Sequence, residues 1–154
     1  MLTINTSTNM IRVKKVDNTQ ELKDAYQIRE VVFIDEQECP PEEEFDGFDE
    51  ESTHFVAYTD GKPVGCCRYR KTEKGVKLER FAVLKETRGA GVGKRLVQTA
   101  LGHIEQQNFN KGTLLYLHAQ IPAMPLYARF GFNQVGEMFE EAGIDHFEMH
   151  KVLG

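Results

Sequence analysis

The chain has 154 residues, of which 40% are hydrophobic and 28% are charged, and its formal net charge is −5. This length predicts one domain with a core of its own, and the balance of residues excludes a disordered chain or a membrane-spanning protein. The sequence has neither a secretory signal nor an apolar stretch of spanning length, so we expect a cytoplasmic protein with no membrane partner. Residues 1–10 predict a flexible extension before a domain over residues 11–154.

Acidic residues are concentrated in one segment. Residues 35–53 contain ten of the 24 acidic residues and no Lys or Arg, which leaves 14 acids against 19 bases elsewhere. The basic body could bind an anionic ligand while the acidic segment faces a cationic substrate, although a solvent-exposed loop explains the same run equally well. Because the basic residues are scattered and the acidic segment would repel phosphates, we expect no nucleic-acid partner.

The cysteines predict neither a disulfide framework nor a metal site. Cys39, Cys66 and Cys67 are an odd number, and two of them are adjacent. This pattern does not form a disulfide framework and fits a reducing compartment. Histidines at zinc-ligand spacing are missing from the sequence, so we expect no metal site.

The first third of the chain predicts a strand and a helix. Residues 11–16 partly alternate, as in a strand, and Asn18 followed by Glu21 matches a capping box at the start of a helix. Pro40 and Pro41 end regular structure, because proline removes a backbone donor and disfavours helix before it. We expect the acidic segment that follows to be a loop.

The remainder predicts a mixed sheet. Alternating residues indicate three antiparallel strands over 54–59, 63–70 and 76–83, the first two joined at Asp60-Gly61. Next come a helix over 92–108, a strand over 114–118, a short helix over 125–130 and strands over 132–139 and 144–152. A right-handed crossover makes the strand over 114–118 parallel to the one over 76–83. The order predicts an α/β fold with helices packed on a mixed, mostly antiparallel sheet.

A glycine-rich turn links the strand over 76–83 to the next helix. Gly89, Gly91 and Gly93 allow backbone N–H groups to point outward, and the helix N-terminus adds unpaired donors and a positive dipole end. A phosphate or pyrophosphate fits such a site. The glycine spacing matches neither the nucleoside-triphosphate loop, which needs Ser or Thr after Lys94, nor the dinucleotide fingerprint.

Several motifs in the sequence resemble those of one protein family. Arg88-x-x-Gly91-x-Gly93 after a strand resembles the coenzyme A motif Q/R-x-x-G-x-G/A of the GNAT family of N-acetyltransferases. The segment PLYARFGF, residues 125–132, is similar to the family's tyrosine-bearing segment. The stretches EQECPPEEEFDGFD, from residue 36, and EEAGIDH, ending at His146, resemble the ElaA/YjcF-like branch. The element order over residues 11–152 also resembles the GNAT fold, with two splayed parallel central strands.

The resemblance implies direct acetyl transfer from acetyl-CoA, as co-substrate, to a primary amine in a ternary complex. Phe81, Ala82 and Val83 would offer backbone groups to the pantetheine arm, and the glycine turn would hold the pyrophosphate. The residues implied at the coenzyme are Phe81, Ala82, Val83, Arg88, Gly89, Ala90, Gly91, Val92, Gly93, Lys94, Gln120 and Tyr127. The alternative is a non-catalytic coenzyme A sensor. Relatives often form homodimers, so a homodimer is possible here.

Candidate catalytic residues come from the same segments. Tyr127 matches the tyrosine that resembles the family's general acid, and a phenol is protonated at neutral pH and can donate to a thiolate. Strand alternation puts Glu79 on the same face as Phe81, together with Lys77 and Val83, so Glu79 is our first candidate for the base. An ordinary cross-strand ion pair is the alternative for Glu79.

Histidines are better matched to base chemistry at neutral pH. His118 is the second candidate for the base, while His54 and His146 are weaker candidates for the acceptor site, and each could instead be structural. The acidic segment predicts a cationic small molecule or a lysine-like amine as the acceptor.

Overall fold

The computed structural model describes residues 10–154, so the flexible extension expected at residues 1–10 falls almost wholly outside the described residues. The strands are β1 (Ile11–Lys15), β2 (Thr53–Thr59), β3 (Lys62–Lys71), β4 (Val76–Val83), β5 (Leu114–Gln120), β6 (Asn133–Glu141) and β7 (Ile144–Val152). The helices are α1 (Thr19–Arg29), the π-helix η1 (Glu30–Glu36), α2 (Pro41–Glu44), the 3-10 turn η2 (Lys85–Thr87), α3 (Val92–Glu105), the 3-10 turn η3 (Ile121–Ala123) and α4 (Met124–Ala128).

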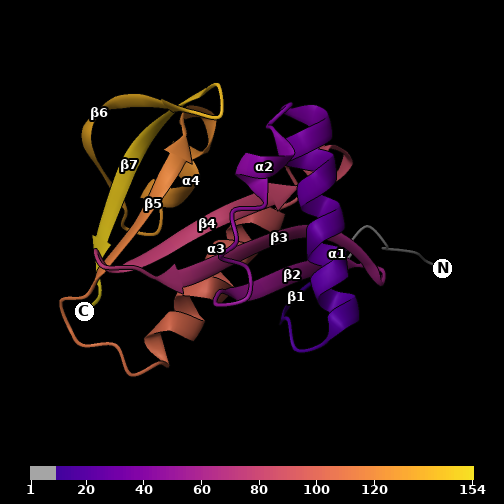
Figure 1. The fold of residues 1–154 in the computed structure, drawn as a ribbon. Coiled ribbons are helices and arrows are strands. Elements are labelled where there is room, and N and C mark those ends of the chain that lie inside the picture. The colour runs from indigo at the N-terminus through magenta and orange to yellow at the C-terminus, as the bar shows by residue number, and fades with distance from the viewer. Residues whose placement is uncertain (1–9) are drawn as a thin grey trace.

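Within this part of the chain, the strands form one sheet in the order β1-β2-β3-β4-β5-β7-β6 (Figure 1). Every neighbouring pair is antiparallel except β4 and β5, which are parallel. The expected fold class, a mixed and mostly antiparallel sheet flanked by helices with a parallel central pair, is confirmed.

The parallel strands β4 and β5 separate soon after they begin. Their pairing consists of Val76 with Leu115 and Lys77 with Tyr116. Beyond this point each strand turns away from the other, and Figure 1 shows β5 and β7 leaning away from β4. Backbone groups on the facing edges of both strands are therefore left without a strand partner, as at the edge of a sheet.

Helices cover both faces of the sheet. Asn18 caps α1 as predicted, because its side chain accepts a hydrogen bond from the Glu21 N–H at 2.8 Å. α1 buries Ala25 and Ile28 against one face, while α3 lies behind the opposite face in Figure 1. The fully buried residues of α3 recur at helical spacing, as Leu96, Val97, Ala100 and Ile104.

A β-bulge in β4 changes which side chains share a face. Cys66 of β3 pairs with Ala82 and Arg68 pairs with Glu79, so two residues of β4 oppose one residue of β3. Arg80, inside the bulge, has φ 58°, a left-handed conformation that is unusual for a residue other than glycine. The expectation that Glu79 and Phe81 share one face is therefore wrong.

Side chains after the bulge point to the face opposite the one that alternation predicts. Leu78 and Phe81 both pack in the core on the α3 side of the sheet, whereas Ala82 packs under α1. Glu79 is directed away from Phe81 for the same reason. The bulge thus separates the predicted base from the strand segment that was expected to hold the coenzyme.

The described residues contain neither a membrane-spanning helix nor a group of metal ligands. Among residues 10–154, no helix is both long and apolar enough to cross a membrane. Over the same residues, His, Cys, Asp and Glu do not gather in any group of three or more that could hold a metal ion. The three cysteines are buried free thiols.

Candidate active site

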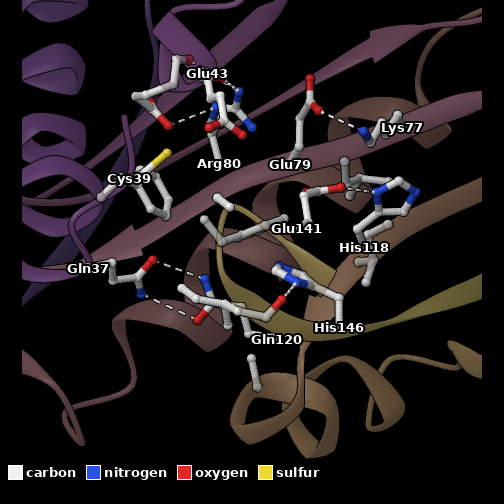
Figure 2. Close-up of a pocket in the computed structure, with 18 of the residues that line it drawn as sticks. Gln37, Cys39, Glu43, Lys77, Glu79, Arg80, His118, Gln120, Glu141 and His146 are labelled. Carbon is white, nitrogen blue, oxygen red and sulfur yellow. Dashed lines mark hydrogen bonds and ion pairs between the residues drawn. The ribbon is translucent and has the colours of Figure 1, made fainter. Parts of the chain in front are cut away.

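A cavity lies where β4 and β5 separate, and its volume is about 320 Å³ (Figure 2). Its walls come from the end of η1, from α2, from both parallel strands, from α4 and from the turn between β6 and β7. The chain segments that build it are therefore far apart in the sequence. Its lining includes aromatic, amide, imidazole, carboxylate and guanidinium groups, a mixture that suits polar chemistry in a partly enclosed site.

The structure brings five of the residues predicted as catalytic or coenzyme-binding to this cavity, including all three catalytic candidates. These are Glu79, Phe81, His118, Gln120 and Tyr127. His146 lines the cavity as well. Ala82, Val83 and the predicted residues from Arg88 to Lys94 lie outside its lining.

His54 is a structural residue. Its side chain is buried, and its Nε2 lies 2.8 Å from the Asp49 carbonyl oxygen, away from the cavity lining. Burial lowers the pKa of its imidazole.

The glycine turn leads from β4 to α3 beside the cavity. Gly89 and Gly91 have φ 88° and 91°, a conformation that glycine adopts without strain. α3 has no side-chain cap, so the N–H groups of its first turn are available to a ligand. Gly93 lies close to α4, because a Cβ built on it would be 3.2 Å from Leu126 Cδ2. These backbone donors are the ones that the predicted anion site would use.

Arg88, at the start of this turn, is held by an internal partner. Its Nη1 and Nη2 each donate a hydrogen bond of 2.7 Å to the carboxylate of Glu36, and its Nε donates to the Val83 carbonyl oxygen at 2.9 Å. This is the fork geometry in which a guanidinium also binds a phosphate.

Tyr127 packs within the apolar wall of the cavity. Its ring meets the rings of Phe81 and Phe132 edge to face, with centroid distances of 5.5 and 6.4 Å. Only 6% of the residue is exposed. Burial raises the pKa of the phenol, since the charged form is disfavoured away from water. The hydroxyl therefore remains a proton donor throughout the physiological pH range.

Glu79 is surrounded by cations. Its Oε2 accepts hydrogen bonds from Arg68 Nη2 at 2.6 Å and Arg70 Nε at 2.7 Å, and its Oε1 lies 3.3 Å from Lys77 Nζ. Burial by itself would raise the pKa of this carboxyl, but Arg68 and the other cations outweigh burial and lower the pKa to about 2. A carboxylate held in this way is a poor proton acceptor. The cross-strand ion pair named as its alternative is what the structure contains.

His118 is held by two carboxylates. Its Nδ1 lies 2.9 Å from Glu141 Oε1 (Figure 2), and its Nε2 lies 3.4 Å from Glu148 Oε1. The ring also meets Phe139 edge to face at 5.0 Å. The hydrogen bond from His118 lowers the pKa of Glu141, which keeps that carboxylate charged. An imidazole fixed by a carboxylate can take up and release a proton at neutral pH.

Sequence reasoning missed Glu141, although it lies in the segment EEAGIDH that carries part of the family resemblance. It comes from the end of β6 and reaches the cavity because the turn into β7 folds over β5. In the same segment, His146 Nδ1 lies 2.7 Å from the Ile144 carbonyl oxygen, and its ring stacks on Phe139.

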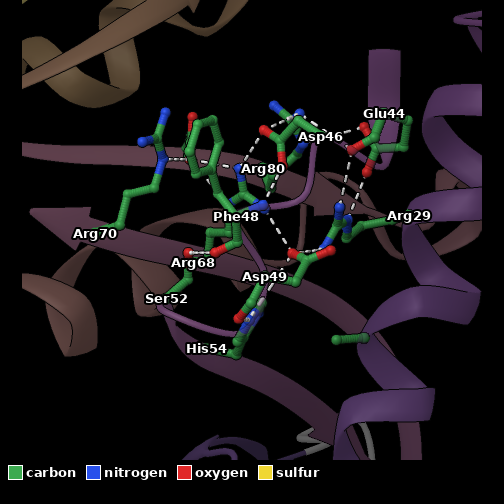
Figure 3. A network of polar contacts seen from close by, with 12 residues as sticks. Arg29, Glu44, Asp46, Phe48, Asp49, Ser52, His54, Arg68, Arg70 and Arg80 are labelled. Carbon is green, nitrogen blue, oxygen red and sulfur yellow. Dashed lines mark hydrogen bonds and ion pairs between the residues drawn. The ribbon is translucent and has the colours of Figure 1, made fainter. Parts of the chain in front are cut away.

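The acidic segment is not a loop throughout, and two of its three acids that line the cavity are held by arginines. α2 forms inside it, and Glu44 is only 3% exposed. Figure 3 shows the reason. Arg29 donates to Glu44 Oε2 at 2.5 Å and to Asp49 Oδ1 at 2.6 Å. Arg68 reaches the same Asp49 oxygen at 2.5 Å, and its Nη2 lies 2.7 Å from Asp46 Oδ2.

These buried pairs account for much of the charge asymmetry. Arginines of the basic body neutralise Glu44, Asp46 and Asp49, so these acids anchor the segment to the sheet. Glu43 differs, since it is exposed and lines the cavity. Of the acids in α2, it is the one placed to meet a cationic ligand.

Arg80 was not singled out by the sequence and is a further part of the wall. Its Nη2 donates to the carbonyl oxygens of Glu43 and Glu44 and to Asp46 Oδ2 at 3.0 to 3.3 Å. The bulge in β4 directs this side chain toward α2. Arg80 therefore ties the acidic wall of the cavity to the strand.

The chain is similar to known acetyltransferases along most of its length. The family model for the acetyltransferase (GNAT) domain matches residues 20–153. The chain is 42% identical to the uncharacterized N-acetyltransferase YjcF of Bacillus subtilis over 135 residues, which cover 87% of this chain and 94% of that protein.

Solved structures are similar along nearly the whole length. The crystal structure of Escherichia coli ElaA has a TM-score of 0.81 and 28% identity, and the match covers 92% of this chain and 99% of that one. An acyl-CoA N-acyltransferase from Pseudomonas aeruginosa has a TM-score of 0.78 and 30% identity, covering 93% and 99% of the two chains.

Proposed function

This chain belongs to the GNAT acetyltransferase family and is an acyl-CoA-dependent N-acyltransferase, and on that premise we propose that it moves an acetyl group from acetyl-CoA to a primary amine. The transfer takes place directly, in a ternary complex. The observation that carries this proposal is the cavity between the separated ends of β4 and β5, because Phe81, His118 and Tyr127 line it together.

The coenzyme would bind along β4. The free edge of the strand near Phe81, Ala82 and Val83 offers backbone donors and acceptors to the amides of pantetheine, as an added strand would. The turn from Arg88 to Lys94, with the N-terminus of α3, would hold the pyrophosphate. The thioester would then enter the cavity.

The reaction needs two proton transfers. A lysine-like amine, with a pKa near ~10.4, is neutral in only about one molecule in two thousand at pH 7, so the ammonium must first lose a proton. The amine nitrogen then forms a bond to the thioester carbon, and the carbon–sulfur bond breaks. Tyr127 would donate its proton to the departing thiolate, a role that the raised pKa of its phenol supports.

His118 is the base in this proposal, in place of Glu79. Glu79 is surrounded by cations, which lower the pKa of its carboxyl to about 2, whereas His118 lies in the cavity with Glu141 at 2.9 Å. Glu141 would fix the ring and stabilise the imidazolium that forms. Glu141 is thus a positioning residue for His118.

The acceptor would be a cationic small molecule or a lysine-like amine. Glu43 supports this assignment, since it is exposed at the cavity, while Glu44, Asp46 and Asp49 are occupied by buried arginines. An ammonium group drawn toward Glu43 would approach the cavity from the side of α2.

A coenzyme A sensor without catalytic activity is the second candidate. The bidentate capacity of Arg88 and the free N-terminus of α3 would serve it equally well. A screen of amines with acetyl-CoA, read out as release of the coenzyme thiol, separates the two functions. Amine-dependent thiol release supports the acetyltransferase, whereas tight acetyl-CoA binding without release across a broad panel of amines supports the sensor.

A further inference from the structure

Two adjacent residues at the end of η1, Glu36 and Gln37, each form hydrogen bonds with a polar side chain near the end of one of the separated strands. Glu36 accepts both hydrogen bonds from Arg88, at 2.7 Å each. Gln37 and Gln120 exchange amide hydrogen bonds, with Nε2 to Oε1 distances of 3.1 and 3.3 Å. Arg88 follows β4 and Gln120 ends β5, so this pair of residues bridges the separated strands.

Both partners are residues that the coenzyme would need. Arg88 is assigned to the pyrophosphate and Gln120 to the coenzyme in the function proposed above. A carboxylate presents two oxygens to a guanidinium much as a phosphate does, so Glu36 occupies the place of the ligand. Arg88 Nε also donates to the Val83 carbonyl oxygen, which keeps the guanidinium beside the glycine turn while its fork faces Glu36.

We propose that Glu36 and Gln37 form an internal strap that acetyl-CoA must displace. This displacement repositions the acceptor wall, which is the part of the cavity wall that contains Cys39 and Glu43. The inference rests on the proposed coenzyme site. Arg88 would exchange the carboxylate of Glu36 for pyrophosphate, and Gln120 would exchange the amide of Gln37 for the coenzyme. The Glu36 half of the strap therefore lowers affinity for the coenzyme and has no such effect on a pantetheine fragment that lacks the pyrophosphate.

The local structure is suited to this movement. η1 is a π-helix, a form that is rarely stable over a long stretch and is frequent at functional sites. Glu38, directly after the strap, has φ 59° and so marks a backbone position of high energy. The Glu36–Arg88 pair is only half-buried, with 35% and 41% of the two side chains exposed, so it can be exchanged at modest cost.

The chain runs from Glu36 and Gln37 directly into the acceptor wall. Cys39 and Glu43, a few residues further along the chain, both line the cavity. A shift of Glu36 and Gln37 would be transmitted to these residues through the short connection of Cys39 to α2. Coenzyme binding and acceptor binding would then be coupled, and such coupling is reciprocal.

The test measures affinity for CoA and for pantetheine by calorimetry in three proteins. Glu36→Gln removes the ion pair while keeping the size of the side chain. Glu86→Gln is the matched control, since Glu86 is an exposed neighbour of Arg88 that raises its pKa at a distance and makes no hydrogen bond to it among the described residues. We expect Glu36→Gln to bind CoA roughly three- to tenfold more tightly than wild type, with pantetheine affinity unchanged.

Glu86→Gln should change CoA affinity less than Glu36→Gln. A Glu36→Gln variant that binds CoA no better than the control, or more weakly than wild type, overturns the strap. If wild type binds no CoA at all, the proposed function itself fails, and the strap fails with it.

A second measurement follows Glu36 directly. The hydrogen bonds from Arg88 lower the pKa of the Glu36 carboxyl in the free protein. Carboxyl NMR titration should show this pKa rising when CoA is bound and staying low with pantetheine. A pKa that does not respond to CoA contradicts the displacement, even in a protein that binds CoA well.

Discussion

His118 Nδ1 lies 2.9 Å from Glu141 Oε1, and both side chains line the cavity between β4 and β5. This pairing joins the end of β6 to β5 through residues 23 positions apart in the sequence. A carboxylate at this distance selects the orientation of the ring and favours its protonated form when a proton arrives. In the proposed function, these two residues would remove the proton from the acceptor amine.

Removal of the imidazole should slow the chemical step. We expect His118→Ala to lower kcat by about a hundredfold and to leave acetyl-CoA affinity close to that of wild type. The dependence of kcat on pH should differ between wild type and the variant, because the proposed base is missing from the variant. A wild-type pH profile retained by His118→Ala would assign the base to another group.

Glu141→Gln tests the positioning role separately. The amide keeps a hydrogen-bond acceptor for His118 but removes the negative charge, so we expect a smaller fall in kcat than for His118→Ala. KM for acetyl-CoA should not change. A kcat equal to that of wild type would contradict the positioning role of Glu141.

Tyr127→Phe should leave the fold intact, because the ring packs edge to face against Phe81 and Phe132 and the substitution removes only the hydroxyl. We expect kcat to fall by about a hundredfold through loss of the proton donor. Acetyl esters of thiols with lower pKa values should be affected less, since their thiolates depart without a proton. Equal losses for all such thioesters would indicate a structural role.

Glu79 should matter for acid stability. Its carboxyl has a pKa of about 2 in the folded protein against an ordinary value of 4.5, so the unfolded chain takes up a proton first as the pH falls. The stabilisation is therefore complete above pH ~4.5 and is lost between ~4.5 and ~2, and the whole effect is about 3 kcal/mol. Urea denaturation at a series of pH values measures this loss.

Glu79→Gln is the variant to compare. It should be less stable than wild type at pH 7, because Arg68 loses a charged partner in a buried setting. The difference between the two proteins should then shrink as the pH falls from ~4.5 to ~2. A constant difference across this range would show that the carboxyl keeps its ordinary pKa.

Glu43 offers a matched test of the acceptor site. Glu43→Lys should raise KM for a cationic acceptor by roughly three- to tenfold, because an attractive charge becomes a repulsive one. Glu42→Lys is the control, since Glu42 is exposed in the same helix but does not line the cavity. Acetyl-CoA affinity should be unchanged in both. Equal effects of the two substitutions would show that Glu43 acts only through the overall electrostatic field and does not contact the acceptor.

Local patterns predicted much of the fold. The Asn18 cap, the turn at Asp60-Gly61 and the glycine turn after β4 each depend on residues close in sequence, and each appears in the structure. The parallel pairing of β4 with β5 followed from the handedness of the crossover. These features need no knowledge of distant contacts.

The candidate site was harder to predict, because distant contacts decide it. The bulge in β4 inverts the expected facing of Phe81, and Arg80, a residue type that gives no sign of a left-handed conformation, occupies it. Buried pairs such as Arg29 with Glu44 join segments whose approach the sequence does not reveal. The role expected of Glu79 therefore changed once its cationic neighbours were known.

Direct transfer is the central claim, and two-substrate initial-rate kinetics test it most directly. The cysteines are buried, and burial raises the pKa of Cys39, Cys66 and Cys67, so none is suited to carry the acetyl group. With acetyl-CoA and an acceptor amine both varied, double-reciprocal plots should intersect. Parallel lines together with an acetylated enzyme detected by mass spectrometry would contradict the account.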